Sequence, residues 1–505
     1  MLNAKRDYVY LFGILLLALF LRTYDLSNNP PELFLDELIN YVSARDIIEK
    51  GGDLYGQVGI YFTDRVIEHR PPVYGYTSYL ASLIVGENAW AIRGPAVFYG
   101  LISIIAVFLL ALELFRDRRA ALMAAFFMAI IPWHIHFSRV GWEPASFLPF
   151  LLFSTYFFLY GVNNNKKSLV VLSFALFSLT NYTYHTAPLF AFLFLLTLFL
   201  TNIKYFLKDK KLLSICILVA GVLVIPYLWE ASTEYHMLKR ARGIYIFSEG
   251  FGAGTLITFA KTYLSHISPN FLFIYGDPFP RYGAWTGGLL HLIMFPFIVF
   301  GIVGLIFSDL ERRYRIFLLV WLLIFPLAVA LTNDWGMPHS ARVLPGAPIL
   351  CLLSGFGFVL AYQHIKSEKP NSIYPKALVL GVILLSLVSL GYFSRDYYGD
   401  YPKRSYQFWE YGNKEIFSII KPVQHKYKRA CLLNLNLASQ KPILAYYMPE
   451  SNLEIIRGID DPRCLERGSI IVQSARKKEI HTELSILGEV KDPDGYTLYL
   501  VQAVE

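Results

Sequence analysis

Long apolar segments separated by short polar connections make up most of this chain. A helix needs roughly 20 apolar residues to cross the hydrocarbon core of a bilayer. Segments near this length recur, and they predict an α-helical polytopic membrane protein with about eleven spans over residues 1–394. The stretch 168–206 also fits one long span followed by a re-entrant piece. The predicted spans are 8–24, 90–115, 119–137, 145–162, 168–183, 186–206, 211–229, 288–308, 315–332, 341–363 and 374–394.

The pattern changes after about residue 395, where the apolar runs shorten to the length of strands. Helical patterns near 412–421 and 441–448 alternate with these runs, and Asp492–Gly495 is a hairpin turn signal. Residues 395–505 therefore predict a small α/β domain. It contains Cys431 and Cys464, for which a disulfide and two free thiols are equally compatible with the sequence. The expected strands are 431–437, 453–457, 469–474 and 484–501.

Basic residues occur at every second connection between the predicted spans. Short cytoplasmic connections carry an excess of Lys and Arg, so these connections are expected on the cytoplasmic side. The N-terminus would then be cytoplasmic, and the remaining connections and the C-terminal domain would be extracytoplasmic. The basic clusters are Lys5 and Arg6, Arg116 to Arg119, Lys166 and Lys167, Lys204 to Lys211, Arg312 to Arg315, and Lys366 and Lys369.

The composition narrows the class of protein further. Of 505 residues, 55% are hydrophobic and 17% charged, which argues against a soluble enzyme of this size. The net charge of +8 is spread over short clusters, so it does not indicate nucleic-acid binding. The spacing of the four cysteines and the histidines does not indicate a zinc site. Residues 8–21 lack a small-residue cleavage site and are best interpreted as an uncleaved first span.

Two acidic residues, Asp36 and Glu37, follow the first predicted span. They could cap an interfacial helix beginning at Leu38, where acids favour the helix dipole, or they could serve in chemistry. Arg70 precedes a Pro-Pro step, and its planar guanidinium suits either a phosphate group or a lipid head group. Arg93 opens the second span and fits a phosphate contact and a structural role equally well.

The turn from Trp133 to Pro144 is unusually polar for a connection between two spans. His134 and His136 have the i, i+2 spacing of a weak metal motif, but structural histidines are the favoured interpretation. Glu143 is either a helix-capping acid or a second functional carboxylate. A structural interpretation of Arg139 pairs it with Glu143 or Asp36.

Other polar side chains lie on the same predicted outer face. Arg342 begins the tenth span, where a guanidinium facing the bundle would suit a phosphate. The sequence contains no Gly-rich phosphate loop, Ser-His-Asp order or nucleotide fingerprint, which argues against nucleotide-driven chemistry. The side chains expected to contact substrate are His136, Arg139, Tyr184, His185, Asp277, Arg281 and His339.

These segments, taken in order, resemble the membrane-embedded GT-C glycosyltransferases. The similarity is to the branch of protein O-mannosyltransferases and lipid A aminoarabinose transferases, over roughly residues 1–365. The Lys-Pro-Pro step of those enzymes is Arg-Pro-Pro here, and the Trp-Trp-Asp signature of oligosaccharyltransferases is absent. The matching segments are "LDE", "RPPVYGY", "AIRGP", "HFSRVGWEP", "FLFIYGDPFPRYGAWTGGLLHLIMFPFIVFG" and "HSARVLPGAPIL".

The resemblance implies an inverting transfer of a sugar from a polyprenyl-phosphate donor to a hydroxyl of a lipid, glycan or protein acceptor. Asp36 would be the general base, Glu37 its support and Glu143 an orienting carboxylate. The donor phosphate would meet Arg70, Arg93 and Arg342. The resemblance leaves a requirement for a divalent metal open, and it implies no nucleic-acid partner.

A transporter or flippase for a lipid-linked sugar is the competing class. It would also have many spans and intramembrane cations. Alternating access, however, requires a site near the membrane midplane that is reached from both sides. The polar clusters of this chain are all expected on one face, which favours the enzyme.

Overall fold

The computed structural model describes most of the chain. The described residues are 4–57, 70–233, 245–247, 250–332, 338–369, 372–433, 441–457, 461–475 and 484–504. His69 and part of the connection before Arg342 therefore lie outside them.

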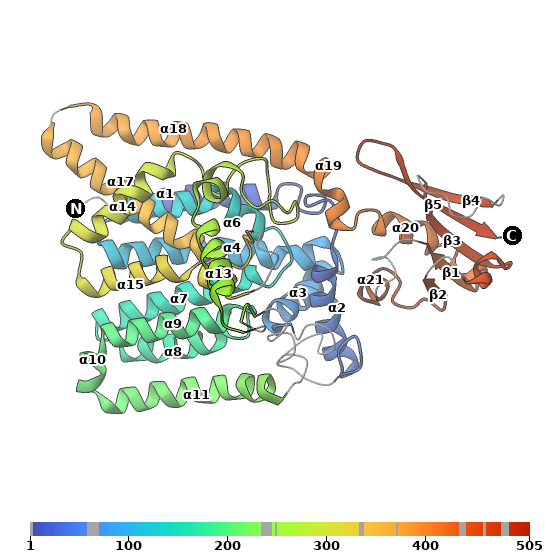
Figure 1. Cartoon of the computed structure of the whole chain (residues 1–505), viewed down its shortest axis with the longest axis horizontal. Coiled ribbons are helices and arrows are strands. Elements are labelled where there is room, and N and C mark those ends of the chain that lie inside the picture. Colours follow the sequence, from blue (N-terminus) through green and yellow to red (C-terminus); the bar gives the residue numbers. More distant parts are fainter. Residues whose placement is uncertain are drawn as a thin grey trace.

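The N-terminal part is a bundle of roughly parallel and antiparallel helices, seen from the side in Figure 1. Its helices up to the long central connection are α1 (Ala4–Thr23), α2 (Leu35–Lys50), α3 (Pro72–Val85), α4 (Ala89–Phe115), α5 (Arg118–Ile130), α6 (Pro132–Phe137), α7 (Pro144–Asn163), α8 (Lys167–Thr180), α9 (Ala187–Thr201), α10 (Ile203–Lys208) and α11 (Lys210–Thr233). The helices that follow are α13 (Ala253–His266), η1 (Asn270–Ile274), α14 (Met294–Phe307), α15 (Arg312–Ile324), α16 (Leu327–Ala330), α17 (Gly346–Glu368) and α18 (Tyr374–Arg395).

Each of the eleven predicted spans contains a helix, so the prediction of a multi-span helical protein is confirmed. Within the described residues, six helices are long and apolar enough to cross a bilayer, and α8, α9 and α14 are shorter apolar helices. The finer count of eleven spans remains a prediction. The stretch 168–206 forms separate helices, which fits two segments better than one long span. The six long helical segments are Ala89–Phe115, Pro144–Asn163, Lys210–Ser232, Arg312–Ala330, Gly346–Glu368 and Tyr374–Trp409.

The two ends of the bundle differ in character. The N-terminus and α10 lie at the left end in Figure 1, whereas α2, α3 and the C-terminal sheet lie at the right end. The basic cluster from Lys204 to Lys211 therefore lies at the end opposite Asp36. This arrangement agrees with the predicted alternation of connections, and the absolute orientation in the membrane remains a prediction.

A linker of short helical turns continues α18 toward the C-terminal domain. Its turns are η2 (Asp396–Asp400), α19 (Tyr401–Ser405) and η3 (Tyr406–Trp409). The domain then contains α20 (Asn413–Ile420), η4 (Gln424–Lys426), α21 (Lys441–Tyr447) and η5 (Pro462–Leu465), together with β1 (Arg429–Leu432), β2 (Glu454–Arg457), β3 (Ser469–Ser474), β4 (Ser485–Lys491) and β5 (Thr497–Val504).

The five strands form one mixed sheet in the order β2-β1-β3-β5-β4. β1 pairs in parallel with β2 and β3, and β5 pairs antiparallel with β3 and β4. The β4–β5 turn closes where the sequence predicted it, because the Gly495 N–H donates to the Asp492 carbonyl at 2.9 Å and Gly495 has φ +89°. The predicted helices near 412–421 and 441–448 and the four predicted strand segments are thus confirmed wherever they fall within the described residues.

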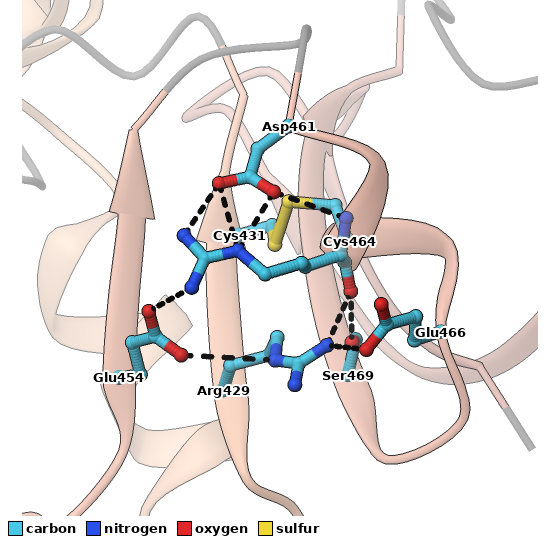
Figure 2. Close-up of a disulfide and its surroundings, with 8 residues drawn as sticks. Arg429, Cys431, Glu454, Asp461, Cys464, Glu466 and Ser469 are labelled. Atoms are coloured by element: carbon cyan, nitrogen blue, oxygen red, sulfur yellow. Dashed lines mark hydrogen bonds and ion pairs between the residues drawn. A yellow bond between two sulfur atoms is a disulfide. The ribbon is translucent and has the colours of Figure 1, made fainter.

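The pairing of Cys431 and Cys464, which the sequence left undecided, is decided in favour of a disulfide. Figure 2 shows the disulfide joining β1 to the η5 turn beside Asp461. Arg463, which precedes Cys464, forms ion pairs with Glu454 and Asp461. Cys216 and Cys351 are free and buried.

The C-terminal domain packs directly on α2. Leu38, Tyr41 and Val42 of α2 share one hydrophobic cluster with Phe417 and Ile443 of the domain. The helix that carries the two acidic residues therefore lies between the bundle and the C-terminal domain, and both constrain its position.

Candidate active site

Asp36, Arg70 and Glu143 form a charged cluster at the start of α2. The Arg70 Nη2 donates to Asp36 Oδ1 at 2.7 Å, and its Nη1 donates to Glu143 Oε1 at 3.0 Å. Arg70 is placed by the turn before α3, and Glu143 by the turn before α7. The tertiary structure therefore joins three groups that lie far apart in the sequence, and one guanidinium holds two carboxylates.

The three side chains differ sharply in exposure. The side chain of Asp36 is 23% exposed, whereas those of Arg70 and Glu143 are 3% and 1% exposed. A carboxylate must be accessible to take a proton from an incoming hydroxyl. Within this cluster, Asp36 is the accessible carboxylate, and the other two groups support it from behind.

Glu37 and Arg93 form a second, fully buried ion pair. Glu37 Oε1 accepts from Arg93 Nε at 2.9 Å and from the Gly141 N–H at 2.6 Å. Its Oε2 accepts from Arg93 Nη2 and from the Phe34 N–H. Gly141 allows this approach, since a Cβ at that position would lie 3.0 Å from Glu37 Oε1 and 2.7 Å from an Ile92 methyl group.

The helix carrying both acids begins at Leu35, three residues before the expected start at Leu38. Both acids therefore lie in its first turn, and Glu37 performs the capping role that the sequence offered as one interpretation. Asp36 instead points to Arg70. The two interpretations thus apply to different residues: Glu37 caps the helix, whereas Asp36 contacts Arg70.

Arg93 has no N–H group left for a ligand. A guanidinium has five N–H groups, and in Arg93 two of them donate to Glu37. The other three donate to the carbonyl oxygens of Leu26, Pro30 and Glu32 at 3.1, 2.8 and 2.6 Å. Its side chain is fully buried. The expected contact between Arg93 and a donor phosphate does not fit this geometry, because the guanidinium is enclosed and saturated by protein oxygens.

Three aromatic rings stack beside the charged cluster. The ring of Tyr282 lies 5.6 Å from that of Trp142 and 4.4 Å from that of His339, and both pairs are nearly parallel. Burial, and next the charge of Asp36, raise the pKa of Tyr282 to about 12. The Tyr282 hydroxyl therefore stays protonated at neutral pH and is a hydrogen-bond donor near the carboxylate.

Arg342 and Asp277 lie near the His339 end of this aromatic stack. Arg342 is partly exposed, and its Nη1 donates to Thr332 Oγ1 at 3.0 Å. Asp277 is buried and accepts from the Ser340 and Phe279 N–H groups at 2.7 and 2.9 Å. Burial raises the pKa of Asp277 to about 6. Asp277 thereby braces the turn that presents His339 and Arg342.

His136 and Arg139, both expected at the substrate, are buried supports. His136 contacts the Tyr397 hydroxyl at 3.1 Å and the Arg281 carbonyl at 2.8 Å. The suggested pairing of Arg139 with Glu143 or Asp36 is wrong, because its N–H groups donate to backbone carbonyls at the end of α1 and in the connection that follows it. These include the Leu21 and Asn29 carbonyls, at 3.0 and 2.6 Å.

The described part of the chain shows no cluster of side chains suited to binding a metal ion. No group of three or more His, Cys, Asp or Glu side chains there could hold an ion. His134 contacts Arg22 Nη2 and the Met128 carbonyl. Both histidine rings contact protein groups, which fits the structural interpretation of the two histidines.

Tyr184 and His185 lie at the edge of the site. Tyr184 is buried, and its ring is 6.3 Å from that of Trp142, while the His185 ring is 6.2 Å from Tyr184. Tyr184 thus packs edge-on against Trp142, one of the rings of the aromatic stack. His185 is partly exposed.

Glu410 was not identified from the sequence, yet it reaches this site. Its Oε1 accepts from Arg281 Nη2 at 3.4 Å, and its Oε2 accepts from the Leu35 N–H at 2.8 Å. Glu410 lies in the linker, where no local motif distinguishes it. Trp142 and Tyr282 could have been found, because each is adjacent to a residue that the sequence had already singled out.

The fold is shared with two solved proteins, ArnT and the archaeal oligosaccharyltransferase AglB. The structure matches ArnT from Cupriavidus metallidurans bound to undecaprenyl phosphate, with a TM-score of 0.63 and 14% identity over 100% of this chain and 99% of that one. It also matches ArnT in the apo state, with a TM-score of 0.60 and 14% identity over 99% and 98% of the two chains. Archaeal AglB from Archaeoglobus fulgidus, in complex with an inhibitory peptide and a dolichol-phosphate, matches with a TM-score of 0.56 and 14% identity over 90% of this chain and 64% of that one.

The sequence carries a more particular match. Residues 69–229 match the family described as Dolichyl-phosphate-mannose-protein mannosyltransferase. This segment includes Arg70, Arg93 and Glu143 but not Asp36. No curated protein sequence matches the chain. The resemblance drawn from the sequence motifs is thus confirmed by the family match and by the fold.

Proposed function

We propose that this protein is an inverting glycosyltransferase that moves a sugar from a polyprenyl-phosphate donor to an acceptor hydroxyl at the outer face of the membrane. The observation that carries the proposal is the partly exposed Asp36 carboxylate, held by Arg70 within a fold shared with ArnT. The family match from residue 69 onward supports the same class of donor.

The reaction needs one displacement. The acceptor oxygen forms a bond to the anomeric carbon while the bond from that carbon to the donor phosphate oxygen breaks. The bonding electron pair leaves with the phosphate, and the acceptor proton passes to Asp36. A single displacement of this kind inverts the anomeric configuration.

The charges of the site suggest a division of roles among the arginines. The cluster of Asp36, Glu143 and Arg70 has a net charge of about −1 when both acids are ionised. Arg70 therefore serves chiefly to orient Asp36. Arg342, which is partly exposed, is the better cation for the charge that develops on the departing phosphate. We assign Arg93 the structural role of holding Glu37.

The aromatic stack forms one wall of the proposed site. Tyr282 offers a protonated hydroxyl beside Asp36, and the outer rings of Trp142 and His339 give apolar surface for a sugar ring. Arg281 and Tyr184 support this wall through Glu410 and Trp142. The acceptor is a lipid, glycan or protein that presents a hydroxyl to Asp36.

A transporter remains the alternative class. The charged cluster lies at one end of the bundle, next to α3 and the C-terminal domain, as the elements in Figure 1 indicate. This placement supports an enzyme, because alternating access requires a site near the midplane.

The proposal is tested with purified protein in lipid nanodiscs and a panel of polyprenyl-phosphate sugars. Sugar transfer and donor binding are measured separately for the wild type and for Asp36→Asn. The variant is expected to retain donor binding and to lose roughly 10²–10⁴-fold in turnover, because the amide cannot accept the proton. Transfer by Asp36→Asn at the wild-type rate would exclude Asp36 as the base, and movement of intact donor across the membrane without transfer would favour the transporter.

A further inference from the structure

The linker between the bundle and the C-terminal domain folds back over the first turn of α2. Glu410 follows η3 directly and has a left-handed backbone conformation, with φ +56°. This region is costly for residues other than glycine. Glutamate at such a position indicates that its side chain is needed there, and the contacts of that side chain show where it acts.

Both oxygens of Glu410 are engaged at the start of the helix that carries Asp36. The Leu35 N–H donates to Oε2 at 2.8 Å. This N–H is in the first turn of α2, where backbone donors lack partners within the helix. The preceding residue, Phe34, provides no side-chain acceptor for it. Glu410 therefore acts as an N-cap from a distant part of the chain.

Arg281 links Glu410 to the opposite side of the same turn. Its Nη2 lies 3.4 Å from Glu410 Oε1, and its Nε donates to the Phe408 carbonyl at 2.7 Å. Its guanidinium lies 4.6 Å from the centroid of the Phe34 ring. The ring of Trp409 packs edge-on against Phe34 at 5.2 Å. Phe34, two residues before Asp36, is thus enclosed.

We propose that Glu410 is a positioning residue, which fixes the first turn of α2 and hence the orientation of the Asp36 carboxylate through Leu35 and Arg281. The proposal deepens the proposed function, on which it rests. It also assigns a task to the linker, which couples the C-terminal domain to the reacting carboxylate.

The charged groups around Glu410 make this role sensitive to pH. Arg281 faces it from the loop before α14, and Asp36 and Glu37 face it from α2. Burial, the largest cause, raises the pKa of Glu410 to about 7. Ionised Glu410 attracts Arg281 and the Leu35 N–H, but burial disfavours the ionised form by more. The closed turn therefore binds the proton more tightly than a solvated Glu410 would, so protonation below this pH favours the closed turn and ionisation above it favours opening.

The test compares Glu410→Ala and Glu410→Gln with Glu415→Gln, an exposed carboxylate on α20, as the matched control. Amide hydrogen exchange of peptides covering 33–40 is measured first, because it does not depend on transfer activity. Glu410→Ala is expected to exchange faster there than both the wild type and the control. Unchanged exchange in Glu410→Ala would overturn the proposal.

Sugar transfer is then measured from pH 5.5 to 8.5. Glu410→Ala is expected to lower turnover by roughly 2- to 30-fold, the range that corresponds to losing a typical N-cap, with donor binding unchanged. The ratio of wild-type to Glu410→Gln turnover is expected to fall as the pH rises through about 7, because only the wild-type side chain ionises and its ionisation opposes the closed turn. A flat ratio overturns the positioning role, even if Glu410→Ala fails to fold. Absence of transfer in the wild type would instead count against the proposed function, and the exchange result would stand separately.

Discussion

Replacing Glu37 by glutamine should destabilise the protein far more than replacing its neighbour Asp36 by asparagine. Glu37 and Arg93 are both fully buried, and the carboxylate accepts four hydrogen bonds. In Glu37→Gln the buried charge of Arg93 loses its counter-ion. In addition, the amide NH₂ of glutamine would face N–H groups that now donate to the Glu37 carboxylate, and those hydrogen bonds would be lost.

The magnitude follows from this geometry. Breaking a buried ion pair by removing one partner costs about 3–5 kcal/mol, because the remaining charge stays buried and uncompensated. Asp36 is different, since its side chain is 23% exposed and its partner Arg70 retains Glu143. Asp36→Asn should therefore change the free energy of unfolding by no more than about 1 kcal/mol.

The assay is thermal unfolding of both purified variants in one detergent, followed by tryptophan fluorescence and compared with the wild type. Glu37→Gln should unfold at a clearly lower temperature, and Asp36→Asn should unfold close to the wild type while losing transfer activity. If the two variants unfolded together, the division of roles between the two acids would be refuted.

Three further predictions address the cations, the topology and the disulfide. Arg342→Ala should raise the KM for donor by roughly ten- to a hundredfold, because losing a charge-assisted contact costs about 1.5–3 kcal/mol. Arg70→Ala should mainly lower kcat, because Asp36 loses its partner. Equal effects of the two variants on KM would contradict this division of roles. A cysteine at the exposed position of Lys421 should react with a membrane-impermeant thiol reagent in intact cells and one at Lys208 should not, and the reverse result would invert the orientation. Replacing Cys431 and Cys464 together by alanine should destabilise the C-terminal domain by about 2–4 kcal/mol, since the bridge closes a separation of 33 residues. Limited proteolysis should then cleave this domain faster in the variant than in the wild type. Equal cleavage rates would show that the bridge contributes little.

Much of the architecture could be predicted from the sequence because it depends on local pattern. Apolar segments of helical length have to bury their backbone polar groups within a helix, so their positions follow from hydropathy. The C-terminal helices, strands and hairpin turn were predicted for a similar reason, since period-2 runs and turn residues specify strands locally. The predicted start of α2 was three residues late, because the residue that caps Leu35 is 375 residues away along the chain.

The candidate site could be predicted only as a set of residues. The pattern identified Asp36, Arg70 and Glu143 as unusual polar groups, and the structure joins them through one guanidinium. The pattern could not decide which arginine is enclosed and which is accessible. Arg93 and Arg342 have similar positions near the start of a helix, but Arg93 is saturated by Glu37 and three backbone carbonyls whereas Arg342 remains partly exposed.

The sequence by itself determined where helices and strands lie and which residues carry charge, because these depend on neighbours in the chain. The tertiary structure alone decided what each charge does. Burial and partners depend on contacts between residues far apart in the chain, such as Leu35 and Glu410, which are 375 residues apart, or Glu37 and Arg93, which are 56 apart. Two adjacent carboxylates of almost identical chemistry thus acquire different roles, because one is enclosed by protein donors and the other is left open to the solvent.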